Sequence, residues 1–133
     1  ILGADFAVLF GQLFPLISKY YSKNRSLSER TSTIGCMGEI ISGMKGGVTP
    51  FTEEVFKLIS QGFSDEDPEV RSNAAFAMGV LIENSDMDIS GHYLTILTAL
   101  RPYFVVAEGA PHAQFNAKDN ATGCVARMLL KNS

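Results

Sequence analysis

Apolar residues recur at three- and four-residue steps along most of this chain, the spacing that places side chains on one face of an α-helix. Between residues 5 and 21 the recurring positions are Phe6, Leu9, Phe10, Leu13, Leu16 and Ile17. Polar or glycine-rich stretches separate such segments, and the whole pattern predicts six helices, near 5–21, 26–44, 49–63, 68–84, 89–104 and 117–131. We therefore expect an all-α protein in which consecutive helices run antiparallel.

Residues that favour helix ends lie between these segments. Asp67 can accept hydrogen bonds from the turn that follows it, and Pro68 suits the first helical position because the N–H that it lacks would have no partner there. Ser26 or Ser28 can begin the second helix in the same way, and the glycines between 43 and 47 end it. The side chains expected to point inward from the later helices are Ile34, Met37, Ile40 and Ile41; Phe51, Val55, Phe56, Leu58, Ile59 and Phe63; Val70, Ala74, Ala75, Met78, Leu81 and Ile82; and Tyr93, Leu94, Ile96, Leu97 and Leu100.

A short pattern occurs three times, once in the second helix of each predicted pair: RTSTIGCMG at 30–38, RSNAAFAMG at 71–79 and KDNATGCVA at 118–126. The copies end 41 and 47 residues apart, a period typical of stacked helix-pair repeats. The sequence therefore predicts an α-solenoid of about three repeats, at approximately 4–45, 49–85 and 89–131. Such arrays bind partners along a surface and rarely contain a catalytic pocket.

The last period is the longer one, and its extra residues fall at 105–116, between the two helices of the third repeat. Connections in helix bundles usually have about two to eight residues. A stretch of this length is therefore either a binding loop, with Glu108 as its acidic residue, or a tolerated surface insertion.

The net charge of −3 is unevenly distributed, because the residues from Asp65 onward include five basic and nine acidic side chains. A nucleic-acid-binding protein needs a basic face, so this class is not expected. An acidic surface instead attracts basic partners and raises their rate of encounter. The run at 64–68 is alternatively no more than a solvated helix start.

The sequence gives little support to several other classes of protein. The longest apolar stretch, at 6–17, is interrupted by glycine and proline and is shorter than the roughly 20 residues that span a bilayer. Cys36 and Cys124 lack a Cys-x-x-Cys partner and are expected to be buried thiols in a reducing compartment. His92 and His112 have no triad or metal-ligand spacing, so we expect neither an enzyme nor a cofactor. The first residues lack the pattern of a signal peptide, and the chain is interpreted as a fragment of a longer superhelix.

The residues DPEVR at 67–71, followed by NAA at 73–75 and MGVL at 78–81, resemble the turn and second helix of a HEAT repeat. With GCMGE at 35–39 and DNATGCVAR at 119–127, they resemble the C-terminal repeats of the importin-β superfamily of nuclear transport receptors, or karyopherins. The similarity covers nearly the whole chain and is greatest to the importin-4 type, which carries histones and ribosomal proteins. The first and third repeats depart from the aspartate-proline pattern of the second.

The resemblance implies a segment that binds extended basic cargo on its concave face, such as histones H3 and H4 or the nuclear localisation signals of ribosomal proteins. It also implies a parent protein that shuttles between cytoplasm and nucleus and contacts nucleoporins. Release by the small GTPase Ran would involve other parts of that protein. No nucleic acid, membrane or cofactor is implied.

The buried stripe of the helix at 68–84 turns its polar residues to the opposite side, which lines the concave surface in HEAT arrays. An asparagine amide there can pair with a peptide backbone of any sequence, and carboxylates can pair with lysines. The expected cargo-binding residues are Asn73, Glu83, Asn120, Asp119, Glu39, Phe76, Glu69 and Glu108.

Each of these assignments has an alternative. The two asparagines can bond to local backbone in the first turns of their helices, Phe76 can pack against the adjacent repeat, and the acids can be ordinary solvated charges. Arg71 and Arg127 are expected to bridge repeats. The whole chain is alternatively a HEAT scaffold segment without a peptide groove, and exposed apolar ends would let the isolated segment self-associate.

Overall fold

The computed structural model describes residues 2–22, 24–104 and 112–131, and these ranges contain helices and no strand. In chain order the elements are α1 (Leu2–Ser18), α2 (Leu27–Met44), the 3-10 helix η1 (Lys45–Phe51), α3 (Thr52–Phe63), α4 (Pro68–Asn84), η2 (Ser90–His92), α5 (Tyr93–Leu100), η3 (Arg101–Phe104) and α6 (His112–Lys131). No helix in the described part is both long and apolar enough to cross a membrane. The expected all-α solenoid architecture is confirmed.

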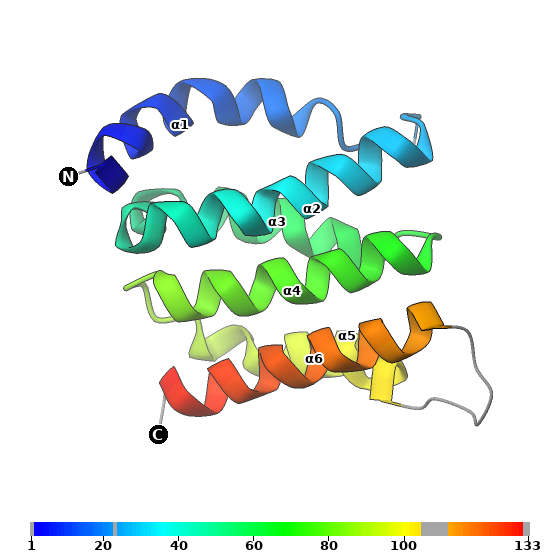
Figure 1. Ribbon diagram of the computed structural model, residues 1–133. Coiled ribbons are helices and arrows are strands. Elements are labelled where there is room, and N and C mark those ends of the chain that lie inside the picture. Colours follow the sequence, from blue (N-terminus) through cyan, green and yellow to red (C-terminus); the bar gives the residue numbers. More distant parts are fainter. Residues whose placement is uncertain (1, 23, 105–111, 132–133) are drawn as a thin grey trace.

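The helices form a layered stack with α4 at its centre. Figure 1 shows α2, α4 and α6 side by side in one layer, with α3 and α5 behind them and α1 along the free edge of α2. Helix α4 packs against α2, α3 and α6. Among the described residues, one side of α4 is therefore free of other helices, and it faces away from α3.

Local capping accounts for where α2 and α4 begin. Asp67 Oδ1 accepts hydrogen bonds from the backbone N–H groups of Glu69 and Val70, at 2.8 and 3.3 Å, and Pro68 is the first residue of α4. Ser26 Oγ accepts from the Glu29 N–H at 3.2 Å and so begins α2. These two predicted caps are confirmed, and they stabilise the helix ends that form the edge of the stack.

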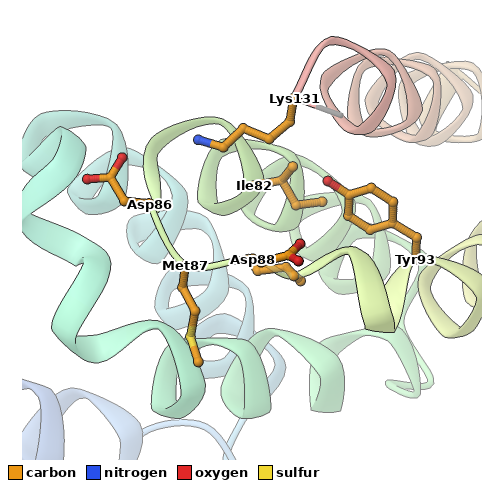
Figure 2. Close-up of a pocket in the computed structure, with 7 residues that line it drawn as sticks. Ile82, Asp86, Met87, Asp88, Tyr93 and Lys131 are labelled. Carbon is orange, nitrogen blue, oxygen red and sulfur yellow. The ribbon is translucent and has the colours of Figure 1, made fainter. Parts of the chain in front are cut away.

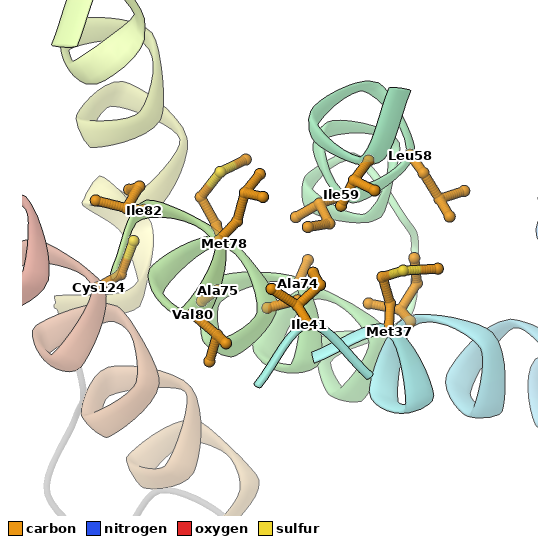
Figure 3. Packing of buried hydrophobic residues seen from close by; sticks show 14 of the residues in the cluster. Met37, Ile41, Leu58, Ile59, Ala74, Ala75, Met78, Val80, Ile82 and Cys124 are labelled. Atoms are coloured by element: carbon orange, nitrogen blue, oxygen red, sulfur yellow. The ribbon is translucent and has the colours of Figure 1, made fainter. Parts of the chain in front are cut away.

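The apolar core surrounds α4. Figure 3 shows Met37 and Ile41 of α2, Ile59 of α3 and Cys124 of α6 directed toward this helix. On α4 itself the buried apolar side chains include Val70, Ala74, Ala75, Met78, Leu81 and Ile82, all six of which the periodicity predicts. Full burial of a side chain of leucine size stabilises a fold by about 1.5–3 kcal/mol. The buried side chains of α4 therefore contribute strongly to the stability of the segment.

The third helix pair differs from the prediction. The expected helix at 89–104 is divided into η2, α5 and η3. Pro102 accounts for the second of these breaks, because it lacks the N–H that an α-helix would use there. Helix α6 begins at His112 rather than near Ala117. Residues 112–116 of the predicted loop at 105–116 therefore belong to α6, and the rest of it, with Glu108, lies outside the described residues.

Some apolar residues predicted to point inward are exposed. On α1 only Phe10 is buried among the predicted positions with described exposure, and Leu16 is 52% exposed. On α5 Leu94 is 78% exposed and Leu97 is 40% exposed. The periodicity identified an apolar face correctly, but no described element covers these parts of α1 and α5. The predicted self-association through such surfaces stays a prediction.

Candidate functional site

The side of the α2, α4 and α6 layer that faces away from α3 and α5 is here called the open face. On α4 the residues that keep solvent exposure there are Glu69, Asn73, Phe76 and Glu83. Their spacing of four, three and seven residues places them in one row along the helix, which also includes Val80. In the sequence repeat, Glu39 of α2 and Arg127 of α6 align with Val80. These two side chains therefore continue the open face on either side of α4.

The two aligned asparagines have different surroundings. Asn120 Nδ2 donates to the Ser72 carbonyl at 3.2 Å and to Ser72 Oγ at 2.9 Å, so this amide joins α6 to α4. In the first repeat the residue that aligns with Ser72 is Thr31, and the buried Thr31 Oγ1 has no hydrogen-bond partner among the described residues. The Asn73 amide forms no hydrogen bond to the described residues. Its Nδ2 lies over Gly35, 3.2 Å from where a β-carbon would be.

Phe76 packs against the neighbouring repeat. A β-carbon built on Gly38 of α2 would lie 2.8 Å from Phe76 Cδ2, so the ring rests directly over this glycine. The ring remains partly exposed on the open face. Phe76 therefore joins two repeats, and only the exposed part of its ring is available to a partner.

The predicted acids also differ from one another. Glu39, Glu69 and Asp119 are exposed, and their carboxylates form no ion pair or hydrogen bond with the described residues. Glu83 Oε2 instead lies 3.2 Å from Arg127 Nε. Asp119 aligns with Ser72, whose position faces the next repeat, so Asp119 lies apart from the row on α4. The structure thus places Glu39 and Glu69 on the same face as Asn73 and Phe76.

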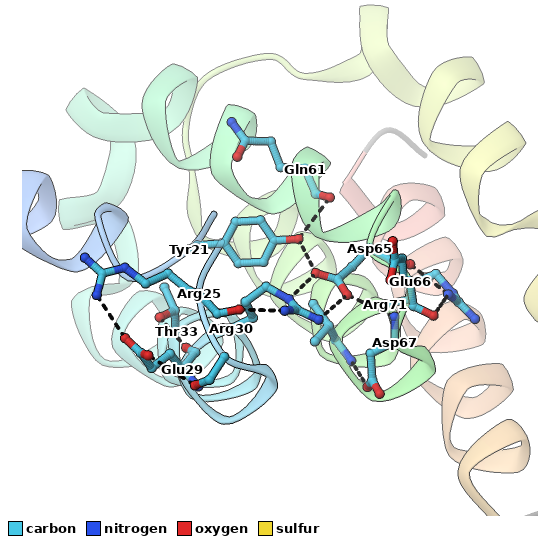
Figure 4. Close-up of polar contacts among 12 residues, drawn as sticks. Tyr21, Arg25, Glu29, Arg30, Thr33, Gln61, Asp65, Glu66, Asp67 and Arg71 are labelled. Carbon is cyan, nitrogen blue, oxygen red and sulfur yellow. Dashed lines mark hydrogen bonds and ion pairs between the residues drawn. The ribbon is translucent and has the colours of Figure 1, made fainter. Parts of the chain in front are cut away.

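A buried polar cluster at the edge of the stack was not expected from the sequence (Figure 4). Asp65 Oδ2 accepts from Arg30 Nε at 3.0 Å and from the Tyr21 hydroxyl at 2.7 Å. Asp65 Oδ1 accepts from the Asp67 N–H at 2.9 Å. The side chain of Asp65 is only 5% exposed and that of Arg30 is 16% exposed. This cluster fixes the start of α2 to the turn between α3 and α4.

Comparisons with known proteins agree with this architecture. The HEAT repeat family model matches residues 55–85. The Schizosaccharomyces pombe protein named probable importin subunit beta-4 is 42% identical over 132 residues, which cover 98% of this chain and 12% of that protein. The chain belongs to the HEAT-repeat importin-β family. Importin-4 of Mus musculus and importin-4 of Homo sapiens are each 29% identical over 128 residues, which cover 96% of the chain and 11% of each protein.

The resemblance stated from the sequence is thereby confirmed, and the chain spans about an eighth or less of the length of these importin relatives. The predicted boundaries of the three repeats at 4–45, 49–85 and 89–131, and a position near the C-terminus of a longer importin, stay predictions.

Within the described part of this importin-β family segment, the hydrogen bonds of Arg71 stay inside its own repeat and do not bridge repeats, contrary to expectation. Its Nη1 donates to the carbonyls of Asp65 and Glu66, at 2.7 and 2.9 Å, within the turn of its own repeat (Figure 4). These carbonyls are only five and six residues away along the chain, so the arginine closes its own turn. Arg127 does bridge repeats, as expected, through Glu83.

The two thiols of the importin-β family segment also differ. Burial raises the pKa of Cys124 to about 12, and the nearby Arg127 only partly opposes this shift. Cys36 is exposed, so the prediction that both cysteines are buried is wrong for this residue. It lies on α2 beside the glycine that contacts Asn73, where the helix surface turns toward solvent.

A small hollow lies at the end of α4. Figure 2 shows Lys131 extending above Asp88, with Asp86 to one side. The volume of the hollow is about 180 Å³, and Lys131 Nζ donates to the Glu83 carbonyl at 3.4 Å beside it. Pockets for drug-sized ligands usually measure about 300–1,000 Å³, so this hollow does not indicate a small-molecule site.

We expect Asn120→Ala to reduce the free energy of unfolding by about 1–2 kcal/mol, because two hydrogen bonds to Ser72 are lost at a partly buried position. Urea denaturation followed by circular dichroism measures this loss. Asn116→Ala, on an exposed position of the same helix, is the matched control. Equal stability of the two variants would show that the bridge from Asn120 contributes nothing.

Proposed function

We propose that this segment forms part of the cargo-binding surface of a nuclear transport receptor, and that the α2 and α4 side of its open face binds an extended lysine-rich peptide. The single observation that carries the proposal is the Asn73 amide, which is partly exposed on the open face and forms no hydrogen bond to the described residues. Its counterpart Asn120 is held by Ser72, so the repeat leaves one asparagine available and engages the other.

The chemistry of this surface suits an extended basic chain. The Asn73 amide can donate to one peptide carbonyl and accept from one peptide N–H, whatever the peptide sequence. The carboxylates of Glu39 and Glu69 can pair with lysine ammonium groups on either side. The exposed edge of Phe76 can contact the aliphatic stem of a lysine. Together these groups would hold both the backbone and the side chains of a cargo segment.

The relatives are named importin-4 and probable importin subunit beta-4, and these names support cargo of the importin class. We propose basic cargo proteins such as histones H3 and H4 or ribosomal proteins, bound through their nuclear localisation signals. Ran and nucleoporins would contact other parts of the parent protein, which would shuttle between cytoplasm and nucleus. This role is one of binding, and it requires no catalytic group. Asp119 and Glu108 stay candidate contacts for a longer cargo.

We expect the double variant Asn73→Ala/Glu39→Gln to bind a lysine-rich histone-tail peptide about tenfold more weakly, because it loses one backbone hydrogen-bond pair and one ion pair worth about 1.4 kcal/mol in total. Fluorescence anisotropy at low and physiological salt measures the affinity. The matched control, Asn24→Ala/Glu54→Gln, removes the same groups from the connection before α2 and from α3, outside the open face. Equal affinity of the two double variants would contradict the proposed groove.

A scaffold role without a peptide groove is the second candidate. It is favoured by the number of open-face groups that already join helices, namely Asn120 with Ser72, Phe76 with Gly38, and Arg127 with Glu83. A folded chain that binds no basic peptide at low salt would support this role. Recognition would then lie elsewhere in the parent protein.

A further inference from the structure

The Arg127 side chain lies on the open face between α4 and α6. Two glycines lie beneath it. A β-carbon on Gly79 of α4 would lie 3.3 Å from Arg127 Cδ, and one on Gly123 of α6 would lie 3.0 Å from Arg127 Nη1. A larger residue at either position would crowd the arginine, so the missing side chains leave room for it to lie across both helices.

The guanidinium of Arg127 is held at one end only. Its Nε donates to Glu83 Oε2 at 3.2 Å, while Nη1 and Nη2 make no hydrogen bond to the described residues. The side chain is 29% exposed, compared with 59% for Glu83. A guanidinium is planar and presents its N–H groups in a fixed fork that matches a carboxylate. The contact with Glu83 therefore orients a group whose Nη1 and Nη2 donors are not engaged by the described residues.

This arrangement affects basic and acidic cargo residues in opposite ways. A lysine that approaches Glu83 must displace Arg127 or accept repulsion from it, so the carboxylate of Glu83 is partly withheld from a purely basic peptide. A carboxylate on the peptide would meet the unused donors of Arg127. On the α2 and α4 side, Glu39 and Glu69 have no such internal cation among the described residues.

We propose that Arg127 is a specificity-determining residue of the open face, which selects a cargo segment with lysines near α2 and α4 and a carboxylate near α6. This inference rests on the proposed function and specifies the charge pattern of the cargo. Helix α6 contains three basic residues, Lys118, Arg127 and Lys131, and one acidic residue, Asp119, so the net positive charge of the helix favours the same polarity.

Two kinds of peptide test the inference by fluorescence anisotropy. One carries lysines only, and the other carries lysines at one end and glutamates at the other, synthesised in both orders. With the wild-type chain we expect the two orders to differ in affinity, because only one of them places its glutamates near α6 when the backbone is bound. Arg127→Gln should weaken binding of the better order about fivefold and strengthen binding of the lysine peptide about threefold.

Arg25→Gln is the matched control, because it makes the same change in net charge at the start of α2, where Arg25 pairs with Glu29 outside the open face. It should shift both affinities slightly and in the direction that net charge alone dictates. Arg127→Lys keeps the charge but loses the fork, so it should lose most of the preference for the mixed peptide while still disfavouring the lysine peptide. Thermal denaturation establishes that each variant is folded.

The outcomes are distinct. Opposite shifts for the two peptides in Arg127→Gln, without them in Arg25→Gln, would establish the inference. If wild type binds the lysine peptide at the groove but Arg127→Gln behaves as Arg25→Gln does, the inference is wrong and the proposed function stands. If the folded wild type binds neither peptide, both the proposed function and the inference are wrong.

Discussion

Asp65→Ala should lower the free energy of unfolding by about 3 kcal/mol, at the lower end of the cost of breaking a buried ion pair. The substitution leaves the Arg30 guanidinium, which is 16% exposed, without its carboxylate. It also removes the acceptor for the Tyr21 hydroxyl and for the Asp67 N–H. Arg30 Nη1 keeps its bond to the Arg25 carbonyl at 2.8 Å, which limits the loss. Urea denaturation of the variant and wild type measures the difference.

Glu66→Ala provides the control for Asp65→Ala. Glu66 is the next residue in the same turn, carries the same charge and is exposed, so its removal should change stability by less than about 0.5 kcal/mol. A similar loss in both variants would show that the turn responds to net charge and that the cluster around Asp65 has no special role.

The contribution of Asp65 to the free energy of unfolding should depend on pH. Burial acts to raise its pKa, but hydrogen bonds from the Asp67 N–H, Tyr21 and Arg30 outweigh burial and hold the pKa of this carboxyl below its ordinary value. The unfolded carboxyl, with a pKa of about 3.9, therefore takes up a proton before the folded one does. The contribution is complete above about pH 4 and is lost as pH falls through the lowered folded value. The stability difference between wild type and Asp65→Ala should shrink accordingly in acid.

The parts of the fold that the sequence predicts best depend on local signals. Helix α4 begins at Pro68 behind the Asp67 cap and ends at Asn84, as expected, because capping and periodicity act over a few residues. The length of α5 was overestimated. Pro102 interrupts the segment, although its apolar pattern continues past the proline. The exposure of Leu94 was not predictable, because periodicity identifies an apolar face but not whether another element covers it.

The candidate site shows the same division. The sequence identified the row of Glu69, Asn73, Phe76 and Glu83, because helix geometry fixes which side chains share a face. It did not distinguish Asn73 from Asn120, which occupy the same position in the repeat. The difference arises from contacts across helices, where Asn120 meets Ser72 and Asn73 lies over Gly35. The link from Arg30 to Asp65 spans 35 residues and was likewise invisible to local patterns.

Gly79 offers the most direct test of how closely α4 and α6 pack. A β-carbon at this position would lie 3.1 Å from Cys124 Cα, which is backbone and cannot move aside as a side chain can. Gly79→Val also adds two further carbons, so α6 must shift and the contacts of Cys124 and Arg127 change with it. Overpacking of this kind costs about 3 kcal/mol, and we expect the midpoint of thermal denaturation to fall by about 10 °C.

Gly43→Val separates this packing effect from the helix propensity of valine. Gly43 lies in α2, and a β-carbon there would have nothing within 4 Å, so only the intrinsic change from glycine to valine operates. That change is small and favourable, and Gly43→Val should be at least as stable as wild type. Since both variants receive the same side chain in a helix, their difference isolates the contact between α4 and α6. If Gly79→Val melts within a degree or two of Gly43→Val, the two helices have room to accept a larger side chain. The close approach at Gly79 would then not hold the layer together, and it would not explain the position of Arg127.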